Sequence, residues 1–341
     1  MLSHSTLLII LSLIEVFIII QLIKVAKSKN FLLDIPNERS SHKSATPKVG
    51  GIAIFALLCI SAFIYPEYFT THILSVLAIS LIFTIGLIDD LKDLSPYPKF
   101  SIIAISSILI IMDGYTINSL GVYFSIDASL GIFAIPFTMF AIIGFTNAVN
   151  LIDGLDGLAG SVSLVILLGF LHLGFVHDDS AIIYLSSIMI VGVSIFLLFN
   201  LHPAKIFLGD NGALLLGFVI AMIAIKLLDY ISPTSVFFLT GIPILDTLFV
   251  MVNRIRNKKS PFIADKTHLH HQIFRHTQNG KKTVYILALS QMMFTLMGLS
   301  LIDNSDILNL SIFATIYMLF FVMLTSSKNQ KEIFNKESTN E

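Results

Sequence analysis

The 341-residue sequence contains no tryptophan, a single cysteine and few charged side chains. Because Cys59 has no second cysteine to pair with, an intrachain disulfide is excluded. Charged residues make up 13% of the chain, whereas a soluble domain carries about 25%. Apolar runs of the length that crosses a bilayer, about 17–25 residues, recur along the whole chain. These scarcities exclude an ordinary soluble protein and indicate an integral membrane protein.

Eleven apolar segments are predicted to be transmembrane helices. Ten spans are the alternative, because the first and fourth breaks between apolar segments are the least distinct. They are 5–23, 49–66, 73–88, 100–117, 130–148, 158–176, 181–200, 211–228, 234–253, 283–302 and 308–325. The first is interpreted as an uncleaved span, because its positive charges follow the apolar run instead of preceding it. No long linker, low-complexity tract or obvious repeat interrupts the series. We therefore expect an all-α, polytopic fold with one domain over 1–341, ending in a polar cytoplasmic tail, 326–341.

Basic residues predict how these spans are oriented. With alternating connections, 20 of the 21 Lys and Arg residues fall on one side, and only Lys226 lies elsewhere. Cytoplasmic loops are enriched in Lys and Arg, so this side is predicted to be the cytoplasm and the N-terminus to lie outside. The net charge of −1 gives no information about partners, because the charges are sorted in space.

Two acidic motifs adjoin the predicted inner ends of spans. "IDDLKD" (88–93) places Asp89 and Asp90 directly after an apolar run. Adjacent carboxylates repel each other unless a proton or a divalent cation lies between them. A solvated acidic turn at a helix end is the alternative. "FLGDNG" (207–212) places Asp210 at the start of a span, where it is either a helix cap or, beside flanking glycines, a ligand for a metal–phosphate group.

A third motif, "NAVNLIDGLDGLAG" (147–160), is polar between two apolar runs. Asn147, Asn150, Asp153 and Asp156 recur at every third position. On a helix the first three share a broad face, and the following glycines favour an end to the helix there. A loop that caps two helices is the alternative, but two amides and two carboxylates exceed what capping requires.

Histidines and lysines add cationic groups on the same predicted side. His268, His270 and His271 lie in the basic loop 254–282, and "SSHKSATPKVGG" (40–51) contributes Lys43 and Lys48. The histidine cluster resembles a zinc site, but no cysteine is near and the other candidate ligands are hard oxygens, which suit magnesium or manganese. Magnesium is commonly held by a few carboxylates and substrate phosphates. The combination predicts phosphoryl-type transfer at the cytoplasmic interface, with a lipid acceptor.

Five motifs in order resemble those of the polyprenyl-phosphate N-acetylhexosamine-1-phosphate transferases: "ATPKVGG", "GLIDDLKDL", "NAVNLIDGLDGLAG", "HPAKIFLGDNGALLLG" and "SPFIADKTHLHH". The resemblance extends over about residues 34–276. It implies that Asp89 and Asp90 engage the lipid phosphate, leaving open which of them, if either, is a general base. It also implies that Asp210 binds Mg²⁺, with Mn²⁺ as the alternative.

The resemblance assigns the other predicted site residues to the donor. Phe207 matches an aromatic that stacks on uracil, and Lys43 a basic residue of the nucleotide site. The three histidines match a motif that contacts the diphosphate. The nucleotide pocket and its surroundings receive the remaining residues: Lys48, Asn147, Asn150, Asp153, Asp156 and Asn200.

The implied reaction joins N-acetylglucosamine 1-phosphate from UDP-N-acetylglucosamine to undecaprenyl phosphate and releases UMP. The product would start an O-antigen, common-antigen or teichoic-acid-type polysaccharide at the bacterial inner membrane. "HLHH" is similar to the N-acetylglucosamine branch, but UDP-N-acetylfucosamine, UDP-N-acetylquinovosamine and the muramoyl pentapeptide remain alternative donors. We expect the lipid bilayer but no nucleic acid as a partner, and leave a homodimer open.

A secondary transporter is the alternative from a different class. Transporters place ionisable residues near the middle of the bilayer on broken helices. Here only Glu15 and Asp246 lie well inside predicted spans. The polar residues instead gather at one interface, which favours the enzyme.

Overall fold

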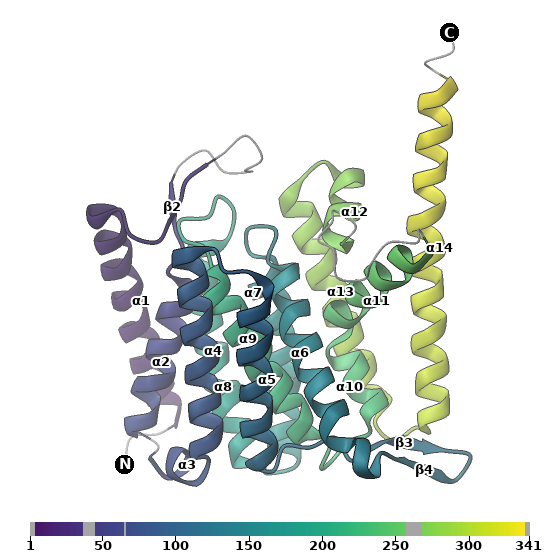
Figure 1. Cartoon of the computed structure of the whole chain (residues 1–341), viewed down its shortest axis with the longest axis horizontal. Coiled ribbons are helices and arrows are strands. Elements are labelled where there is room, and N and C mark those ends of the chain that lie inside the picture. The colour runs from purple at the N-terminus through teal and green to yellow at the C-terminus, as the bar shows by residue number, and fades with distance from the viewer. Residues whose placement is uncertain (1–3, 37–44, 65, 257–267, 338–341) are drawn as a thin grey trace.

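The computed structural model describes residues 4–36, 45–64, 66–256 and 268–337, which form a bundle of long helices (Figure 1). Eight of the described helices are long and apolar enough to cross a membrane, and the count rises to nine if one bent pair is a single span. They are α1 (His4–Lys29), α4 (Ile73–Lys92), α6 (Ala134–Ile152), α7 (Leu158–Val176), α8 (Ser180–Asn200), α9 (Gly209–Leu227), α13 (Gly280–Ser300) and α14 (Asp306–Glu337). The prediction of a polytopic membrane protein is confirmed.

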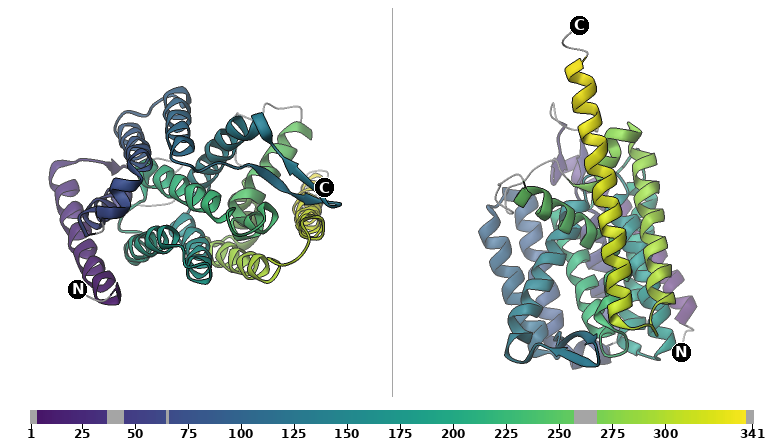
Figure 2. Two further views of the ribbon diagram at one scale, coloured as in Figure 1. Left: turned by 90° about the horizontal axis from the view of Figure 1, so that it is seen from below. Right: turned by 90° about the vertical axis from the view of Figure 1, so that its right-hand side faces the viewer.

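Each of the eleven predicted spans corresponds to a helix or to a pair of helices. Two of these helices, α2 (Gly50–Ile64) and α5 (Pro96–Met112), are apolar but shorter than the eight. Residues 326–337 of the predicted polar tail continue α14, which projects beyond the rest of the bundle (Figures 1 and 2). The described residues also form the short helices α3 (Pro66–Thr71) and α12 (Leu269–Thr277) and the 3-10 turn η1 (Gly131–Phe133).

The prediction of an all-α fold needs one correction, because two small antiparallel sheets occur in connections. One pairs β1 (Leu33–Asp34) with β2 (Thr46–Pro47), and the other pairs β3 (Ser119–Tyr123) with β4 (Ile126–Ser129). Strands of two to five residues are too short to give the alternating pattern that identifies a strand in a sequence. The first sheet lies at the upper end of the bundle in Figure 1, and the second at the lower end.

The predicted span 234–253 is also corrected, because it is broken into α10 (Pro233–Leu239) and α11 (Gly241–Arg256), which meet at 92°. Backbone groups freed by such a break must be satisfied inside the protein when no water is near. Gln291 of α13 does this: it accepts a hydrogen bond from the Ile242 amide at 2.9 Å and donates one to the Leu239 carbonyl at 2.8 Å. The fully buried glutamine therefore stabilises the bend.

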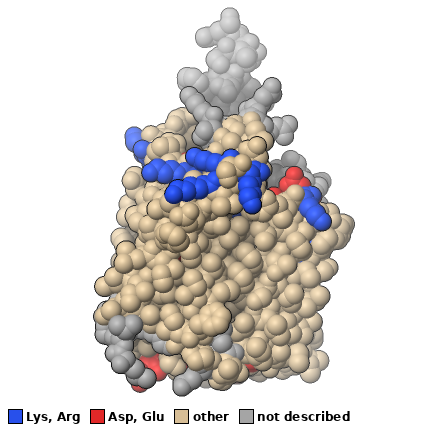
Figure 3. All heavy atoms as spheres, turned by 90° about the vertical axis from the view of Figure 1, so that its left-hand side faces the viewer, with Lys and Arg blue, Asp and Glu red and all other residues tan. Residues whose placement is uncertain are grey.

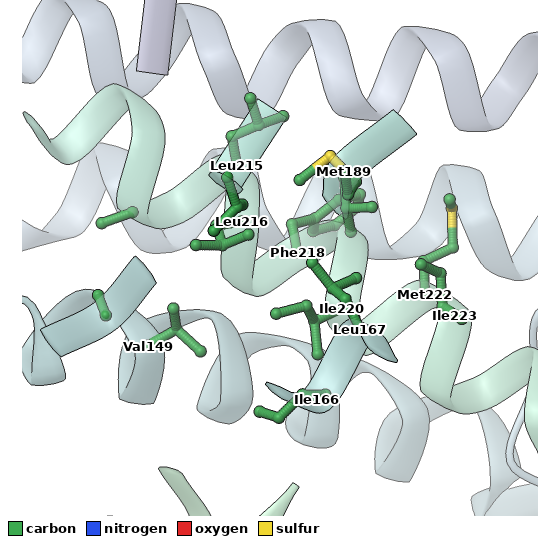
Figure 4. Close-up of a cluster of buried hydrophobic side chains, with 14 of the residues drawn as sticks. Val149, Ile166, Leu167, Met189, Leu215, Leu216, Phe218, Ile220, Met222 and Ile223 are labelled. Carbon is green, nitrogen blue, oxygen red and sulfur yellow. The ribbon is translucent and has the colours of Figure 1, made fainter. Parts of the chain in front are cut away.

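Helix α9 is the centre of the bundle, and nearly all of its side chains are buried. It packs against α2, α4, α6, α7 and α8. Figure 4 shows part of this core, where Phe218 of α9 lies among Leu167 of α7 and Met189 of α8. The N-terminal end of α9 is thereby fixed relative to the ends of α4 and α6, which are the elements that carry the acidic motifs.

Glycines allow the helices to approach the start of α9 closely. A Cβ atom on Gly51 of α2 would lie 2.2 Å from the Gly212 amide nitrogen, and one on Gly86 of α4 would lie 2.5 Å from the Asn211 Cα. Small residues at helix contacts are typical of membrane proteins, in which association depends on close packing. The distance between α4 and α9 therefore depends on having no side chain at position 86.

Lys and Arg side chains gather near one end of the face drawn in Figure 3. This is the upper end in Figure 1, where α4 and α6 end and α9 begins. The described residues thus bring the basic side chains and the acidic motifs to the same end of the bundle. That this end faces the cytoplasm stays a prediction from the positive-inside pattern.

We predict that Gly86→Ala lowers the melting temperature of the detergent-purified protein. The new methyl group would meet backbone atoms of α9 and force the helices apart, a type of overpacking that costs about 1–3 kcal/mol. Gly144→Ala is the matched control, because a Cβ atom on Gly144 of α6 has no neighbour within 4 Å. Equal melting temperatures for the two variants would contradict the packing argument.

Candidate active site

A polar pocket of about 340 Å³ opens at the end of the bundle where α4 and α6 end and α9 begins. Residues from segments that are far apart in the sequence line it, and five of them are aspartates. The lining residues are Asp34, Lys48, Asp90, Asn150, Asp153, Gly154, Leu155, Asp156, Asn200, Phe207, Leu208, Gly209 and Asp210. The three acidic motifs, Lys48 and Phe207 therefore meet in one pocket.

Asp90 binds the N-terminal turn of α9. Its carboxylate accepts hydrogen bonds from the amides of Asp210 at 3.1 Å and Asn211 at 2.9 Å, and from the Asn211 side chain at 2.5 Å. A helix N-terminus favours a negative charge, because its first amides have no partner within the helix. Gly209 permits this approach: its φ is +74°, and a Cβ atom there would lie 2.7 Å from an Asp90 oxygen. Asp90 thus fixes the position of Asp210.

Asp89 is buried beside this contact and has two further partners. Its carboxylate forms an ion pair with Lys99 of α5 at 2.7 Å and accepts a hydrogen bond from the Leu94 amide at 2.8 Å. The Asp210 carboxyl group lies close enough to the same side chain for the two groups to affect each other's protonation. Two carboxyl groups in contact need a shared proton or a cation between them. The Asp89–Asp210 pair, with Lys99 beside it, is therefore a candidate ligand pair for a divalent cation.

Asp153 follows the last residue of α6 and faces the other acidic groups. Desolvation and then the charges of three neighbouring aspartates raise the pKa of Asp153 to about 7. Burial is the larger cause of this shift, and the negative charges of Asp210, Asp90 and Asp156 add to it. Among the described residues that line the pocket, Lys48 forms an ion pair with Asp90, whose Oδ1 lies 3.8 Å from the Lys48 Nζ.

Asp156 and Asn200 hold the pocket loops together. The Asp156 carboxylate lies 2.8 Å from the His202 Nδ1 and accepts a hydrogen bond from the Ala204 amide at 3.2 Å. The Asn200 side chain accepts from the Gly157 amide and donates to the Ile206 carbonyl, both at 2.8 Å. Both residues therefore join the loop after α6 to the loop before α9 as well as lining the pocket.

The histidine motif forms the start of α12 and lies beside the pocket. His268 is buried, and its Nδ1 lies 2.7 Å from Asp246 of α11. His270 packs on the backbone after Asp153, because a Cβ atom on Gly154 would lie 2.5 Å from its Nε2. Desolvation, followed by the charge of His271, lowers the pKa of His270 to about 4. His270 is therefore a neutral imidazole at pH 7, next to the acidic loop.

The structure does not bring every predicted site residue to the pocket wall. Asp89 and the histidines 268, 270 and 271 lie behind or beside it, and Asn147 is one helical turn below Asn150 without lining it. Lys43 lies outside the described residues. The roles that the resemblance implies for all of these positions stay predictions.

Four site residues were missed by the sequence reasoning. Asp34 lines the pocket from β1, Lys99 binds Asp89, His202 binds Asp156, and Asp246 binds His268. His202 belongs to a quoted motif and Lys99 follows one by five residues, so a search for a counter-charge to each acidic motif would have found them. Asp34 and Asp246 stand alone in the sequence, and only the fold brings them to the site.

The residues present fit a cation that is completed by its substrate. Among the described residues, no group of three or more His, Cys, Asp or Glu side chains is arranged to hold a metal ion unaided. The donors that face one another are carboxylate oxygens, which suit Mg²⁺. Mg²⁺ is usually held by one or two carboxylates, with substrate phosphates and water completing its octahedron.

Comparison with known proteins identifies the class. The profile of glycosyl transferase family 4 matches residues 72–228, which contain the acidic motifs of α4, α6 and α9. A protein of Bacillus subtilis (strain 168), named probable undecaprenyl-phosphate N-acetylglucosaminyl 1-phosphate transferase, is 32% identical over 92% of this chain and 89% of its own length. Undecaprenyl-phosphate alpha-N-acetylglucosaminyl 1-phosphate transferase of Escherichia coli (strain K12) is 30% identical over 81% of this chain and 77% of its own.

The chain therefore belongs to glycosyl transferase family 4. Within this class it is an enzyme, a phosphoglycosyl transferase of the membrane. The family that the motifs predicted is confirmed, and the transporter alternative is set aside.

We predict that Asp153 makes the stability of the metal-free protein fall as the pH rises from about 4 to about 7. In that window the folded state, with its pKa of about 7, binds more protons than the unfolded state, whose carboxyl pKa is near 3.8. Melting temperatures in EDTA at pH 5 and pH 7.5 should therefore differ more for the wild type than for Asp153→Asn. Parallel pH dependences would show that the carboxyl group is not perturbed.

Proposed function

We propose that this enzyme transfers N-acetylglucosamine 1-phosphate from UDP-N-acetylglucosamine to undecaprenyl phosphate. The products are undecaprenyl-diphospho-N-acetylglucosamine and UMP. The observation that carries the proposal is the convergence of Asp90, Asp153, Asp210 and Lys48 with Phe207 in one pocket at a membrane-bundle end. The names of the relatives in Bacillus subtilis and Escherichia coli supply the substrates.

The proposed reaction is an exchange of one phosphoanhydride bond for another. An oxygen of the lipid phosphate attacks the phosphorus that carries the sugar, and the bond from that phosphorus to the bridging oxygen breaks. The bridging oxygen leaves with UMP. A phosphate monoester has a second pKa near 6, so the attacking phosphate is largely a dianion at pH 7 and needs little help from a base. Positioning and charge stabilisation supply most of the rate in such transfers.

The protein groups have distinct proposed tasks. Lys48 lies at the pocket wall and attracts phosphate charge, while Phe207 offers an aromatic face to the uracil. Asp210, fixed by Asp90 and in contact with Asp89, would hold Mg²⁺ with one or two of its neighbours. When bound, the ion neutralises diphosphate charge and stabilises the leaving UMP. His270 and His271 would approach the diphosphate from α12.

The acceptor chain has a candidate binding place in the membrane part of the bundle. A cavity of about 560 Å³ lies between α6, α9, α10, α11 and α14, and its lining is almost wholly apolar. Ala148 lines this cavity while Asn150, two residues on, lines the polar pocket. We propose that a segment of the polyprenyl chain occupies the cavity while the phosphate reaches the polar end. Burial of each CH₂ group contributes about 0.8 kcal/mol.

We further propose that the pocket faces the cytoplasm in the bacterial inner membrane, where the nucleotide sugar is made available. The product would initiate a cell-surface polysaccharide of the O-antigen, common-antigen or teichoic-acid type. UDP-N-acetylfucosamine and UDP-N-acetylquinovosamine differ from the proposed donor only in the sugar ring. A panel of UDP-sugars in one UMP-release assay would establish which of them is used.

We predict that the purified protein releases UMP from UDP-N-acetylglucosamine in the presence of undecaprenyl phosphate and Mg²⁺. EDTA should stop the release and added Mg²⁺ restore it. Asp210→Asn should lower the rate by about two orders of magnitude or more, the scale found when one charge-stabilising group is removed. Asp229→Asn, an exposed acid at the other end of α9, is the control. Near-normal rates in Asp210→Asn would rule out its role in metal binding.

We predict that Gly144→Phe raises the KM for undecaprenyl phosphate about tenfold, the scale of a modest misfit in an apolar pocket. The phenyl group would project into open space in the apolar cavity and compete with the chain. The KM for the nucleotide sugar should not change. Gly280→Phe at the start of α13 also adds a ring in open space but outside the cavity, and should alter neither constant. An unchanged lipid KM in Gly144→Phe would place the prenyl chain elsewhere.

A further inference from the structure

Asp246 is a buried carboxylate that the transfer chemistry described above does not use. It lies on α11, five residues after the helix begins at the 92° bend, and its exposed fraction is 1%. Its Oδ2 lies 2.7 Å from the His268 Nδ1, and its Oδ1 accepts a hydrogen bond from the Leu269 amide at 2.5 Å. Both carboxylate oxygens are therefore bonded to the first turn of α12.

These contacts compensate a charge that would otherwise be costly to bury. A buried carboxylate is tolerated only where it is paired and hydrogen-bonded. The imidazole of His268 and the amide end of α12 together provide this environment, since a helix N-terminus stabilises an anion. Because the His268 side chain is itself only 6% exposed, the pair is screened from water.

The same turn of α12 carries the histidine that touches the pocket loop. The rings of His268 and His270 are nearly parallel, with centroids 5.9 Å apart. His270 is 3% exposed and its ring lies against Gly154, directly after Asp153. Its Nδ1 has no hydrogen-bond partner in the described residues. No hydrogen bond at Nδ1 therefore fixes this imidazole, and its orientation depends on how α12 packs against α11.

The bend between α10 and α11 allows the start of α12 to pack against Asp246 of α11. Gln291 bonds to both sides of the break, so that α11 leaves the bundle direction at a fixed angle and runs below α12 (Figure 1). The Asp246 carboxylate therefore points to the start of the histidine helix.

We infer that Asp246 is a positioning residue: it anchors α12 so that His270 and His271 meet the diphosphate in the carboxylate pocket. The inference rests on the proposed function, in which the donor diphosphate lies in that pocket. Displacements of about 1 Å in such groups lower turnover about 100-fold while leaving the binding of distant parts of the substrate intact. Loss of the anchor should therefore lower kcat more than it raises either KM.

The kinetic test uses the full-length protein in detergent with Asp246→Asn, His268→Gln and the double variant. Asp246→Asn should lower kcat about 10- to 100-fold with both KM values within about twofold. Because the two side chains act as one unit, the double variant should lose no more than the worse single variant. Asp113→Asn is the matched control. Asp113 is a partly buried acid at the opposite end of the bundle that accepts two hydrogen bonds from Ser75.

A second measurement reports the seating of α12 without any turnover. In a Cys59→Ala background, Leu269→Cys places the single thiol at a position that is 2% exposed. A membrane-impermeant maleimide should label it slowly in the otherwise unchanged protein. Adding Asp246→Asn should accelerate labelling at least about tenfold, whereas adding Asp113→Asn should not. The ratio of the labelling rates with and without Asp246→Asn reports the contact between Asp246 and α12, and no substrate is needed to measure it.

The two measurements separate the possible failures. If the wild type releases no UMP, the proposed function is wrong, and the labelling ratio alone decides whether Asp246 anchors α12. If the wild type is active but Asp246→Asn behaves like Asp113→Asn in kcat, the positioning role is overturned. Additive losses in the double variant would also overturn it, because they would mean that Asp246 and His268 act separately.

Discussion

The contact on which the site depends is that of the Asp90 carboxylate with the N-terminal amides of α9. It joins the end of α4 to the start of the most buried helix of the bundle. The contact exists only because Gly86 and Gly209 lack side chains where the two backbones and the carboxylate approach one another. Once it forms, the position of Asp210 follows from the helix geometry, and the Asp89–Asp210 contact brings two negative groups together. Electrostatic repulsion between these carboxyl groups is thus imposed by packing.

The fold was largely predictable because a membrane limits the choices. Apolar runs located the helices to within a few residues, except that α1 and α14 continue beyond the predicted ends, and eleven runs gave eleven helices or helix pairs. The break at Leu239 and Gly241 was missed, because its 20 residues read as one apolar run and its stabilising partner, Gln291, lies on another helix. The two short sheets were missed for a related reason: hairpins this small are stabilised by tertiary contacts, and their sequences carry no period.

The site was predictable where its residues cluster in sequence and not where the fold alone unites them. Asp153, Asp156 and Asp210 lie in motifs at the ends of spans, and the structure brings them into one pocket. Asp34 gave no such signal. The tasks of individual side chains were also beyond the sequence, since spacing cannot show that Asn200 bonds two loops or that His268 turns towards Asp246. Conversely, the polar face expected of Asn147 does not reach the pocket wall.

Helix α6 separates two environments, with the polar pocket near one side of its last turns and the apolar cavity near the other. Under the proposed function, a water-soluble nucleotide and a lipid would arrive through different media and through different openings. With the two binding places near different sides of α6, the entry of one substrate would not require that the other has already bound. Helix α6, which separates the two binding places, would thus allow the substrates to bind in either order and to react where α6 ends.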